Sequence, residues 1–204
     1  MKLIKSGALA IGSNVIIADL HLGLFRFHDP VLIERVAKLA EKFETVIIAG
    51  DLKHLGKRSL TKEFIEKISG LAELIVIRGN HDVGVDYRLE NSRGIRLGKY
   101  GIFHGHAIPE ERVLDAKCLI FAHAHPSVLL TDDVGGYKER AFLMGEVTIN
   151  AERKRVVVLP AFNEICASTA VNIERPAGFA FRRWDYKEWD AVLLDGTVLK
   201  LSTL

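Results

Sequence analysis

The first half of the chain alternates three short apolar runs with two amphipathic segments, and this alternation is the strongest constraint on its fold. The runs cover residues 15–18, 45–49 and 74–77 and are rich in valine and isoleucine. Nearly continuous apolar, β-branched runs are typical of strands buried on both faces of a sheet. The alternation therefore predicts a βαβαβ unit.

Both intervening segments have the periodicity of helices. Apolar residues recur on one stripe of the first segment, at Leu32, Val36, Leu39, Ala40 and Phe43. Asp29 is the expected N-cap of this helix, and Pro30 is its expected first residue. Ser59 is the expected cap of the second helix, with Glu63 in the first turn. The predicted apolar face of that helix consists of Phe64, Ile65, Ile68 and Leu71.

From about residue 94 the pattern changes to short strands joined by tight turns. Turn residues occur at 98–99, before an apolar run at 100–103, and at 195–196, between runs at 191–194 and 197–199. Such turns predict an antiparallel second half. No repeat or linker separates the halves, so we expect residues 1–204 to form one α/β domain with two packed sheets.

The composition bounds the class of protein. With 204 residues, of which 49% are hydrophobic and 26% charged, the chain can bury a sizeable core, and its formal charge of +2 does not indicate a nucleic-acid binder. No apolar stretch approaches the roughly 20 residues that span a bilayer, so we expect a soluble cytoplasmic protein without a membrane partner. Cys118 and Cys166 have no C-x-x-C spacing and are expected to be free thiols. The absence of glutamine is typical of proteins from hot environments.

Polar residues follow five of the apolar runs, and seven of the eight histidines lie among them. The five clusters are Asp19 with His21, Asp51 with His54, Asn80 with His81 and Asp82, His104 with His106, and His123 with His125. Because the carboxyl ends of neighbouring strands meet at one edge of a sheet, five separate segments can contribute to one site.

The residue types in these clusters suit a binuclear metal site. Carboxylate, amide and imidazole donors come from Asp19, Asp51, Asn80, His21, His104, His123 and His125. Mixed N/O donors without cysteine suit Mn, Fe, Co, Ni or catalytic Zn. In D-x-H and H-x-H the one-residue gap puts both side chains on one face if the backbone stays extended. Each cluster alone has a structural reading: a histidine that ends a strand, a capping Asp51, or Asn80 in a turn.

In this order the five clusters resemble the pattern of the calcineurin-like metallophosphoesterase superfamily: D-x-H, G-D, G-N-H-D/E, H, and G-H-x-H. The resemblance implies a four-layer α/β/β/α sandwich. The implied metal ligands form two groups that share one residue: Asp19, His21 and His125 for the first ion, Asn80, His104 and His123 for the second, and Asp51 for both. One departure is Ala122, where the family usually has glycine. If that position requires a positive φ, alanine costs about 1 kcal/mol.

The resemblance also implies a mechanism. Two divalent ions, Mn most of all, would clamp a phosphoryl oxygen and activate a shared water to attack a phosphodiester. His81 would be the general acid for the leaving alkoxide, and Asp82 would orient its imidazole. His54, in a G-D-L-x-H segment similar to that of the double-strand-break nucleases of the family, and His106 are candidate substrate-binding residues. A supporting hydrogen bond is the alternative for both, and His28 is expected to face solvent.

A later segment narrows the substrate class. Residues 159–163, L-P-A-F-N, resemble small ICC-like phosphoesterases, including the branch associated with DNA ligase, helicase and exonuclease partners. The alternative for this segment is a strand followed by a proline turn without a functional meaning. The resemblance favours DNA or RNA as the substrate and DNA-repair proteins as partners, with phosphate contacts from the basic residues Lys53, Lys57, Arg58 and Arg78. The alternatives are a small-molecule diesterase acting on cyclic nucleotides and a metal-binding scaffold without catalysis, against which His81 argues.

Overall fold

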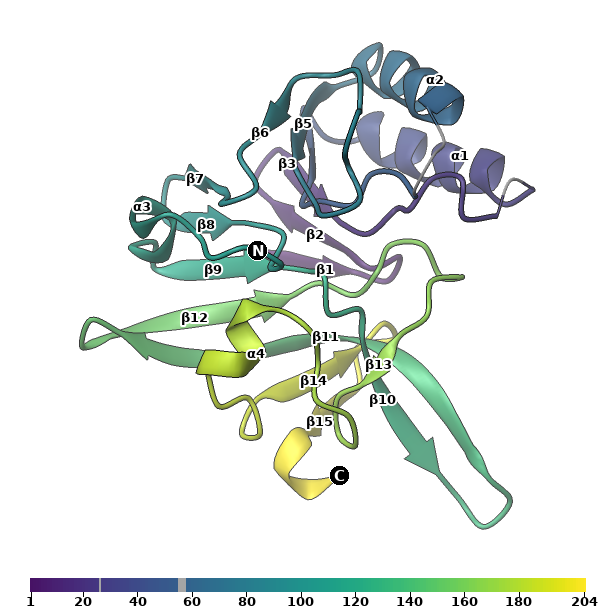
Figure 1. Ribbon diagram of the computed structural model, residues 1–204. Coiled ribbons are helices and arrows are strands. Elements are labelled where there is room, and N and C mark those ends of the chain that lie inside the picture. The colour runs from purple at the N-terminus through teal and green to yellow at the C-terminus, as the bar shows by residue number, and fades with distance from the viewer. Residues whose placement is uncertain (26, 55–57) are drawn as a thin grey trace.

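The computed structural model describes residues 1–25, 27–54 and 58–204, and its strands form two sheets (Figure 1). Over the described residues the first sheet has the order β1 (Lys2–Ile4), β2 (Ala8–Ile11), β3 (Asn14–Ile17), β4 (Thr45–Ile48), β5 (Glu73–Ile77) and β6 (Leu89–Glu90). Strands β3 to β6 are parallel, whereas β1 and β2 are antiparallel additions. Helix α1 (Asp29–Ala40) connects β3 to β4, and α2 (Arg58–Ser69) leads to β5. The predicted βαβαβ unit is confirmed.

The second sheet is mixed rather than antiparallel. Its path is β13 (Thr169–Ala170), β10 (Pro126–Thr131), β11 (Gly136–Ile149), β12 (Glu152–Val158), β9 (Cys118–Phe121), β8 (Tyr100–Ile102) and β7 (Ile95–Leu97). Off this path, β14 (Asp190–Leu193) pairs with β11, and β15 (Val198–Lys200) pairs with β14. The two predicted tight turns are confirmed between β7 and β8 and between β14 and β15. However, β9 pairs in parallel with both β8 and β12. The segment from β8 to β9 contains α3 (Glu111–Leu114) and crosses over, so the chain re-enters the sheet in the same direction.

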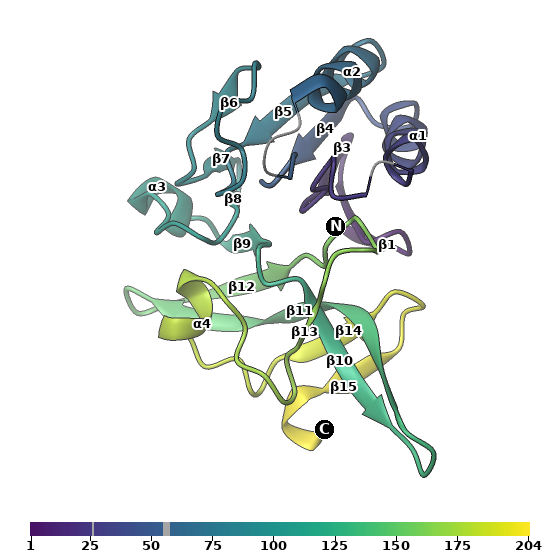
Figure 2. The same ribbon diagram turned by 45° about the vertical axis from the view of Figure 1, so that its right-hand side comes forward.

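The helices and sheets form four layers (Figures 1 and 2), and apolar cores lie between them. Between the sheets lie Leu9, Ile16, Ile47, Ile120, Phe142 and Val157. The apolar faces of α1 and α2 cover the outer face of the first sheet through Leu32, Val36, Phe64 and Ile68. The outer face of the second sheet packs against α3, α4 (Phe179–Arg183) and the loop that contains Trp189. This is the predicted α/β/β/α sandwich, although α3 and α4 are short.

The helix ends differ from the sequence expectation. Helix α1 has His28 at its N-cap, so Asp29 is the first helical residue, and its carboxylate accepts a hydrogen bond from the Gly23 N–H at 3.1 Å. His28 is not solvent-facing as predicted, because its ring is half-buried and its Nε2 lies 3.6 Å from a carboxylate oxygen of Glu164. Asp29 at this position still places a negative charge in the first turn.

In the second helix the predicted cap and the predicted last apolar residue both fall elsewhere. Helix α2 begins at Arg58, one residue before Ser59, whose side chain lies outside the described part of the structure. Leu71 lies beyond the helix end at Ser69 and is exposed. None of the helices in the described parts of the chain has the length and apolar character that a membrane crossing requires.

Candidate metal centre

Loops that follow β3 and β4 run side by side at the carboxyl edge of the first sheet. The Asp19 N–H donates to the Gly50 carbonyl at 3.0 Å, and the His21 N–H donates to the Asp51 carbonyl at 2.9 Å. In the second sheet the loops after β8 and β9 are joined in the same way, with Ala122 N–H donating to the His104 carbonyl at 2.9 Å. Backbone hydrogen bonds thus hold the segments that carry the predicted ligands in fixed register.

Five of the seven predicted ligands lie on left-handed backbone, not on the extended backbone expected from the D-x-H and H-x-H spacing, whereas Asn80 and His104 do not. The φ angles are 56° at Asp19, 44° at His21, 53° at Asp51, 71° at His123 and 44° at His125. This conformation costs a non-glycine residue on the order of 1 kcal/mol and is concentrated at functional sites. It turns each side chain inward where the strand ends.

Two glycines permit close approach of the loops. A Cβ atom on Gly50 would lie 2.4 Å from the His104 ring, and one on Gly79 would lie 2.1 Å from Asp51 Oδ1. These contacts explain physically why a glycine precedes Asp51 and Asn80. Ala122, in contrast, has no positive φ, so the strain expected there does not arise and falls on the next residue instead.

All seven predicted ligands belong to one cluster of side chains in contact. Two histidine contacts join them to the carboxylates: His125 Nε2 lies 3.2 Å from Asp19 Oδ1, and His104 Nε2 lies 3.3 Å from Asp51 Oδ2. The remaining members are adjacent: His21 Nε2 is 3.6 Å from Asp51 Oδ2, Asn80 Oδ1 is 3.2 Å from His104 Nε2, and the His123 and His104 ring centroids are 4.9 Å apart.

Asp51 lies between two groups of donor atoms. Asp19, His21 and Asp51 offer atoms within 4.8 Å of one another, and so do Asp51, His104 and His123. Asp51 is thus positioned where a shared ligand would be needed, and the roles of these residues as ligands stay a prediction.

The donor set fits divalent cations. The two carboxylates, Asp19 and Asp51, are buried, and both ring nitrogens of His21 are buried without a hydrogen-bond partner in the described part of the chain. Burial of adjacent carboxylates and of an unsatisfied imidazole costs several kcal/mol unless a cation compensates. These atoms therefore suit a metal centre better than an ion-free hydrogen-bond network.

The histidines of the cluster have different pKa values because their surroundings differ. Burial lowers the pKa of His21 to about 4 against the opposing pull of Asp19, and burial together with the charge on His104 lowers the pKa of His123 to about 4. Burial also opposes protonation of His125, but the adjacent Asp19 carboxylate outweighs it and raises the pKa of His125 to about 9. Near neutral pH, His21 and His123 are thus in the neutral form that ligates metals, whereas His125 would have to give up a proton.

His81 lies at the edge of the cluster, and its neighbours are Asp51, His21 and His54 rather than the predicted Asp82 carboxylate. Its backbone N–H donates to Asp51 Oδ1 at 2.9 Å, its ring centroid lies 4.9 Å from that of His21, and its ring stacks on His54 at 5.6 Å. The Asp82 carboxylate does not orient this ring, because it accepts hydrogen bonds from the backbone N–H groups of Gly79 at 2.8 Å and Lys53 at 3.2 Å. Burial raises the pKa of Asp82, with those two bonds opposing the shift. Asp82 therefore supports the loop.

Only some of the other residues predicted to bind the substrate are exposed to solvent. Lys53 is 2% exposed and its Nζ donates to the His81 carbonyl at 3.0 Å, so the prediction that it contacts phosphate is wrong. Arg78 is exposed, whereas Lys57 and the side chain of Arg58 lie outside the described residues. His106 is half-buried at the rim, with its ring centroid 5.1 Å from that of His104.

The L-P-A-F-N segment packs directly on the loop that carries Asp19 and His21. The Phe162 N–H donates to the Ala18 carbonyl at 2.9 Å, and Asn163 Nδ2 donates to the Leu20 carbonyl at 2.9 Å. This packing brings Cys166 to the candidate metal centre, with its Sγ 3.9 Å from the Asp19 carbonyl oxygen. Burial, reinforced by the nearby charge of Asp19, raises the pKa of this thiol to about 12. Sequence reasoning missed Cys166 because no local spacing links it to a histidine or an aspartate.

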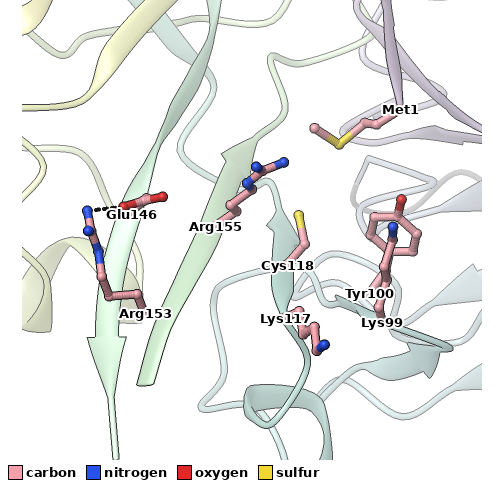
Figure 3. Close-up of a pocket in the computed structure, with 8 residues that line it drawn as sticks. All are labelled: Met1, Lys99, Tyr100, Lys117, Cys118, Glu146, Arg153 and Arg155. Carbon is pink, nitrogen blue, oxygen red and sulfur yellow. Dashed lines mark hydrogen bonds and ion pairs between the residues drawn. The ribbon is translucent and has the colours of Figure 1, made fainter. Parts of the chain in front are cut away.

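A separate cavity of about 310 Å³ opens where β8 and β9 begin, at the opposite ends of the strands that lead to His104 and His123 (Figure 3). Basic side chains of Lys99, Lys117, Arg153 and Arg155 surround it, and Arg153 is paired with Glu146. The cavity therefore lies at the opposite end of these strands from the candidate metal centre and is not part of it.

Comparisons with known proteins agree with this geometry. The model of the calcineurin-like phosphoesterase superfamily domain matches residues 13–159. The structure is similar to that of the nuclease MPE of Pseudomonas putida, with 18% sequence identity, a TM-score of 0.66, and coverage of 97% of this chain and 94% of that chain. Comparison with curated protein sequences gives no significant match.

Two further solved structures have lower scores. Vps29 of Entamoeba histolytica has 19% identity, a TM-score of 0.36, and coverage of 72% of this chain and 98% of that chain. A predicted phosphoesterase of Streptococcus pneumoniae has 14% identity, a TM-score of 0.38, and coverage of 91% of both chains. The family match spans well over half of the chain and includes all five polar clusters. The chain therefore belongs to the calcineurin-like phosphoesterase superfamily.

Proposed function

We propose that this protein is a metal-dependent phosphodiesterase that hydrolyses nucleic acid. The observation that carries the proposal is the arrangement around Asp51, whose Oδ2 lies 3.6 Å from His21 Nε2 and 3.3 Å from His104 Nε2. Two donor groups that share one buried carboxylate are the arrangement that a binuclear hydrolase requires.

Two divalent ions would be held by the residues named above, with Mn as the first ion to test. The first position uses Asp19, His21 and His125, the second uses Asn80, His104 and His123, and Asp51 serves both. When bound, the ions would supply Lewis acidity toward the phosphoryl oxygens and an activated water. The chain contributes neutral imidazoles at His21 and His123, since burial lowers the pKa of each to about 4.

His81 is the proposed general acid for the leaving oxygen. Its backbone is fixed by the hydrogen bond to Asp51, and its ring is half-buried against His54, so the imidazole is held at the rim of the metal cluster. No hydrogen bond from a described residue occupies its Nδ1. Its placement thus comes from the backbone and from ring stacking, and Asp82 acts only through the loop.

Exposed aromatic rings support a nucleic-acid substrate. Phe25 and Phe27 follow His21 by a few residues, are 41% and 82% exposed, and have ring centroids 5.9 Å apart. Aromatic rings of this kind are stacking partners for bases of single strands. The similar fold of the nuclease MPE, together with Arg78 beside Asn80, favours the same substrate class.

The test is a substrate screen on metal-free protein with Mn²⁺ added back. We expect cleavage of bis-p-nitrophenyl phosphate and of single-stranded DNA or RNA, no activity without metal, and wild-type activity in His28→Ala, a histidine outside the cluster. Cleavage of cyclic nucleotides alone would replace the proposal with a small-molecule diesterase. Metal binding without any hydrolysis would replace it with a scaffold.

A further inference from the structure

Cys166 is a buried thiol that faces the metal centre from the second half of the chain. It is 8% exposed, and its Sγ lies within 4.8 Å of a ring nitrogen of His21 and of one of His125. The three residues form a candidate metal-binding group of their own, in addition to the groups built on the two carboxylates.

His21 supplies the independent indication of a ligand at this place. It is 6% exposed, and neither of its ring nitrogens has a hydrogen-bond partner within the described residues. A buried imidazole with two unsatisfied nitrogens is costly, and a thiol is a weak hydrogen-bonding group that cannot compensate it. A cation in contact with both side chains would satisfy them together.

The position of the thiol is fixed by a turn anchored on the metal loop. The Asn163 side chain accepts a hydrogen bond from the Ile165 N–H at 3.1 Å and donates to Leu20 at 2.9 Å. The Cys166 N–H donates to the Asn163 carbonyl at 3.2 Å, and His125 Nδ1 is 2.9 Å from the Ala167 carbonyl oxygen. The same short segment therefore orients both Cys166 and the His125 ring.

We propose that Cys166 is a ligand of the ion held by Asp19, His21 and His125. This inference rests on the proposed metal centre and changes its chemistry. Coordination uses the thiolate, so the thiol proton passes to solvent when the ion binds. The first position then has N, O and S donors, whereas the second, at Asn80, His104 and His123, has N and O donors.

The consequence is that the two positions prefer different ions. Thiolate ligands favour Zn²⁺, Co²⁺ and Fe²⁺ over Mn²⁺, which prefers oxygen donors. The first position is therefore selective for the softer ions, and the second accepts Mn²⁺. The seven residues found from the sequence do not predict this asymmetry.

Cobalt spectroscopy of the metal-free protein tests the assignment directly. On addition of Co²⁺ we expect a thiolate-to-cobalt charge-transfer absorption in the near ultraviolet. The band should be absent in Cys166→Ser, with two ions still bound by elemental analysis, and unchanged in Cys118→Ser. Cys118 is the matched control, because it is also a buried free cysteine but lies in the core between the sheets. In competition, Cys166→Ser should lose about 10-fold or more of its preference for Zn²⁺ over Mn²⁺.

Wild-type protein that binds two Co²⁺ ions without the band would overturn the assignment, as would a band that persists in Cys166→Ser. The wild-type measurement decides even if the variant does not fold. Failure of the proposed function has a different signature: a protein that shows the band but hydrolyses no phosphodiester keeps the ligand and loses the enzyme. A protein that binds no Co²⁺ at all refutes both.

Discussion

The replacement Gly79→Ala offers a sharp test of the role of Asp51. The added Cβ would lie 2.1 Å from Asp51 Oδ1 and 2.2 Å from the Asp51 backbone nitrogen, where ordinary contacts begin at 3.4 Å. The loop that carries Gly79 and the carboxylate of Asp51 must therefore move apart by about 1.3 Å. The backbone atom cannot rotate away as a flexible side chain would, so the displacement is imposed on Asp51 itself.

We expect two measurable effects of this displacement. Overpacking of this kind costs roughly 1–3 kcal/mol, which corresponds to a decrease of about 2–12 °C in Tm for a chain of this length. A shift larger than 1 Å also moves Asp51 Oδ2 away from His104 Nε2, which is now 3.3 Å distant. The affinity for metal should fall by about 10- to 100-fold.

Isothermal titration of metal-free protein with Mn²⁺ and thermal unfolding measure the two effects. Gly135→Ala is the matched control, because a Cβ at Gly135 meets no atom of the described residues within 4 Å and its φ is not in the left-handed region. Wild-type metal affinity in Gly79→Ala would refute the position of Asp51 as the shared ligand. An equal loss in Gly135→Ala would show that the effect is not specific to the site.

Three further outcomes are expected. His81→Ala should keep both metal ions while kcat falls by roughly 10²- to 10⁴-fold, and the decrease should be smaller for a nitrophenyl ester, whose leaving group needs no proton. Loss of metal in His81→Ala would refute the acid role. Asp51→Ala, in contrast, should lose metal and activity together. Phe27→Ala should raise KM for single-stranded DNA several-fold without effect on bis-p-nitrophenyl phosphate, and equal effects on both substrates would exclude base stacking. In metal-free protein, burial raises the pKa of Cys166 to about 12 and also raises that of Cys118. Both side chains therefore stay protonated thiols at pH 8 and should resist iodoacetamide until the chain unfolds. Rapid labelling of the native protein would contradict this expectation.

Much of the fold and most of the cluster could be predicted from the sequence, because the signals are local. Continuous β-branched runs, a 3.6-residue apolar period and polar residues where a run stops are each readable within about a dozen positions. They were sufficient for the βαβαβ unit and for the seven residues that meet around Asp51. The parallel insertion of β9 between β8 and β12 has no such signal, because strand pairing depends on where a crossover returns.

The remaining features of the site depend on contacts between distant segments. Side-chain direction at Asp19 and His125 follows from left-handed φ angles, which are maintained only because backbone hydrogen bonds to neighbouring loops compensate their cost. Lys53 and Asp82 are turned toward backbone groups of the facing loop, so residue type alone misassigned both. Cys166 is distant in sequence from every predicted ligand and reaches the centre because the L-P-A-F-N turn packs on the Asp19 loop. The chemistry of the strand ends is thus a local property, whereas the identity of the neighbours of each donor is fixed by the packing of the two sheets.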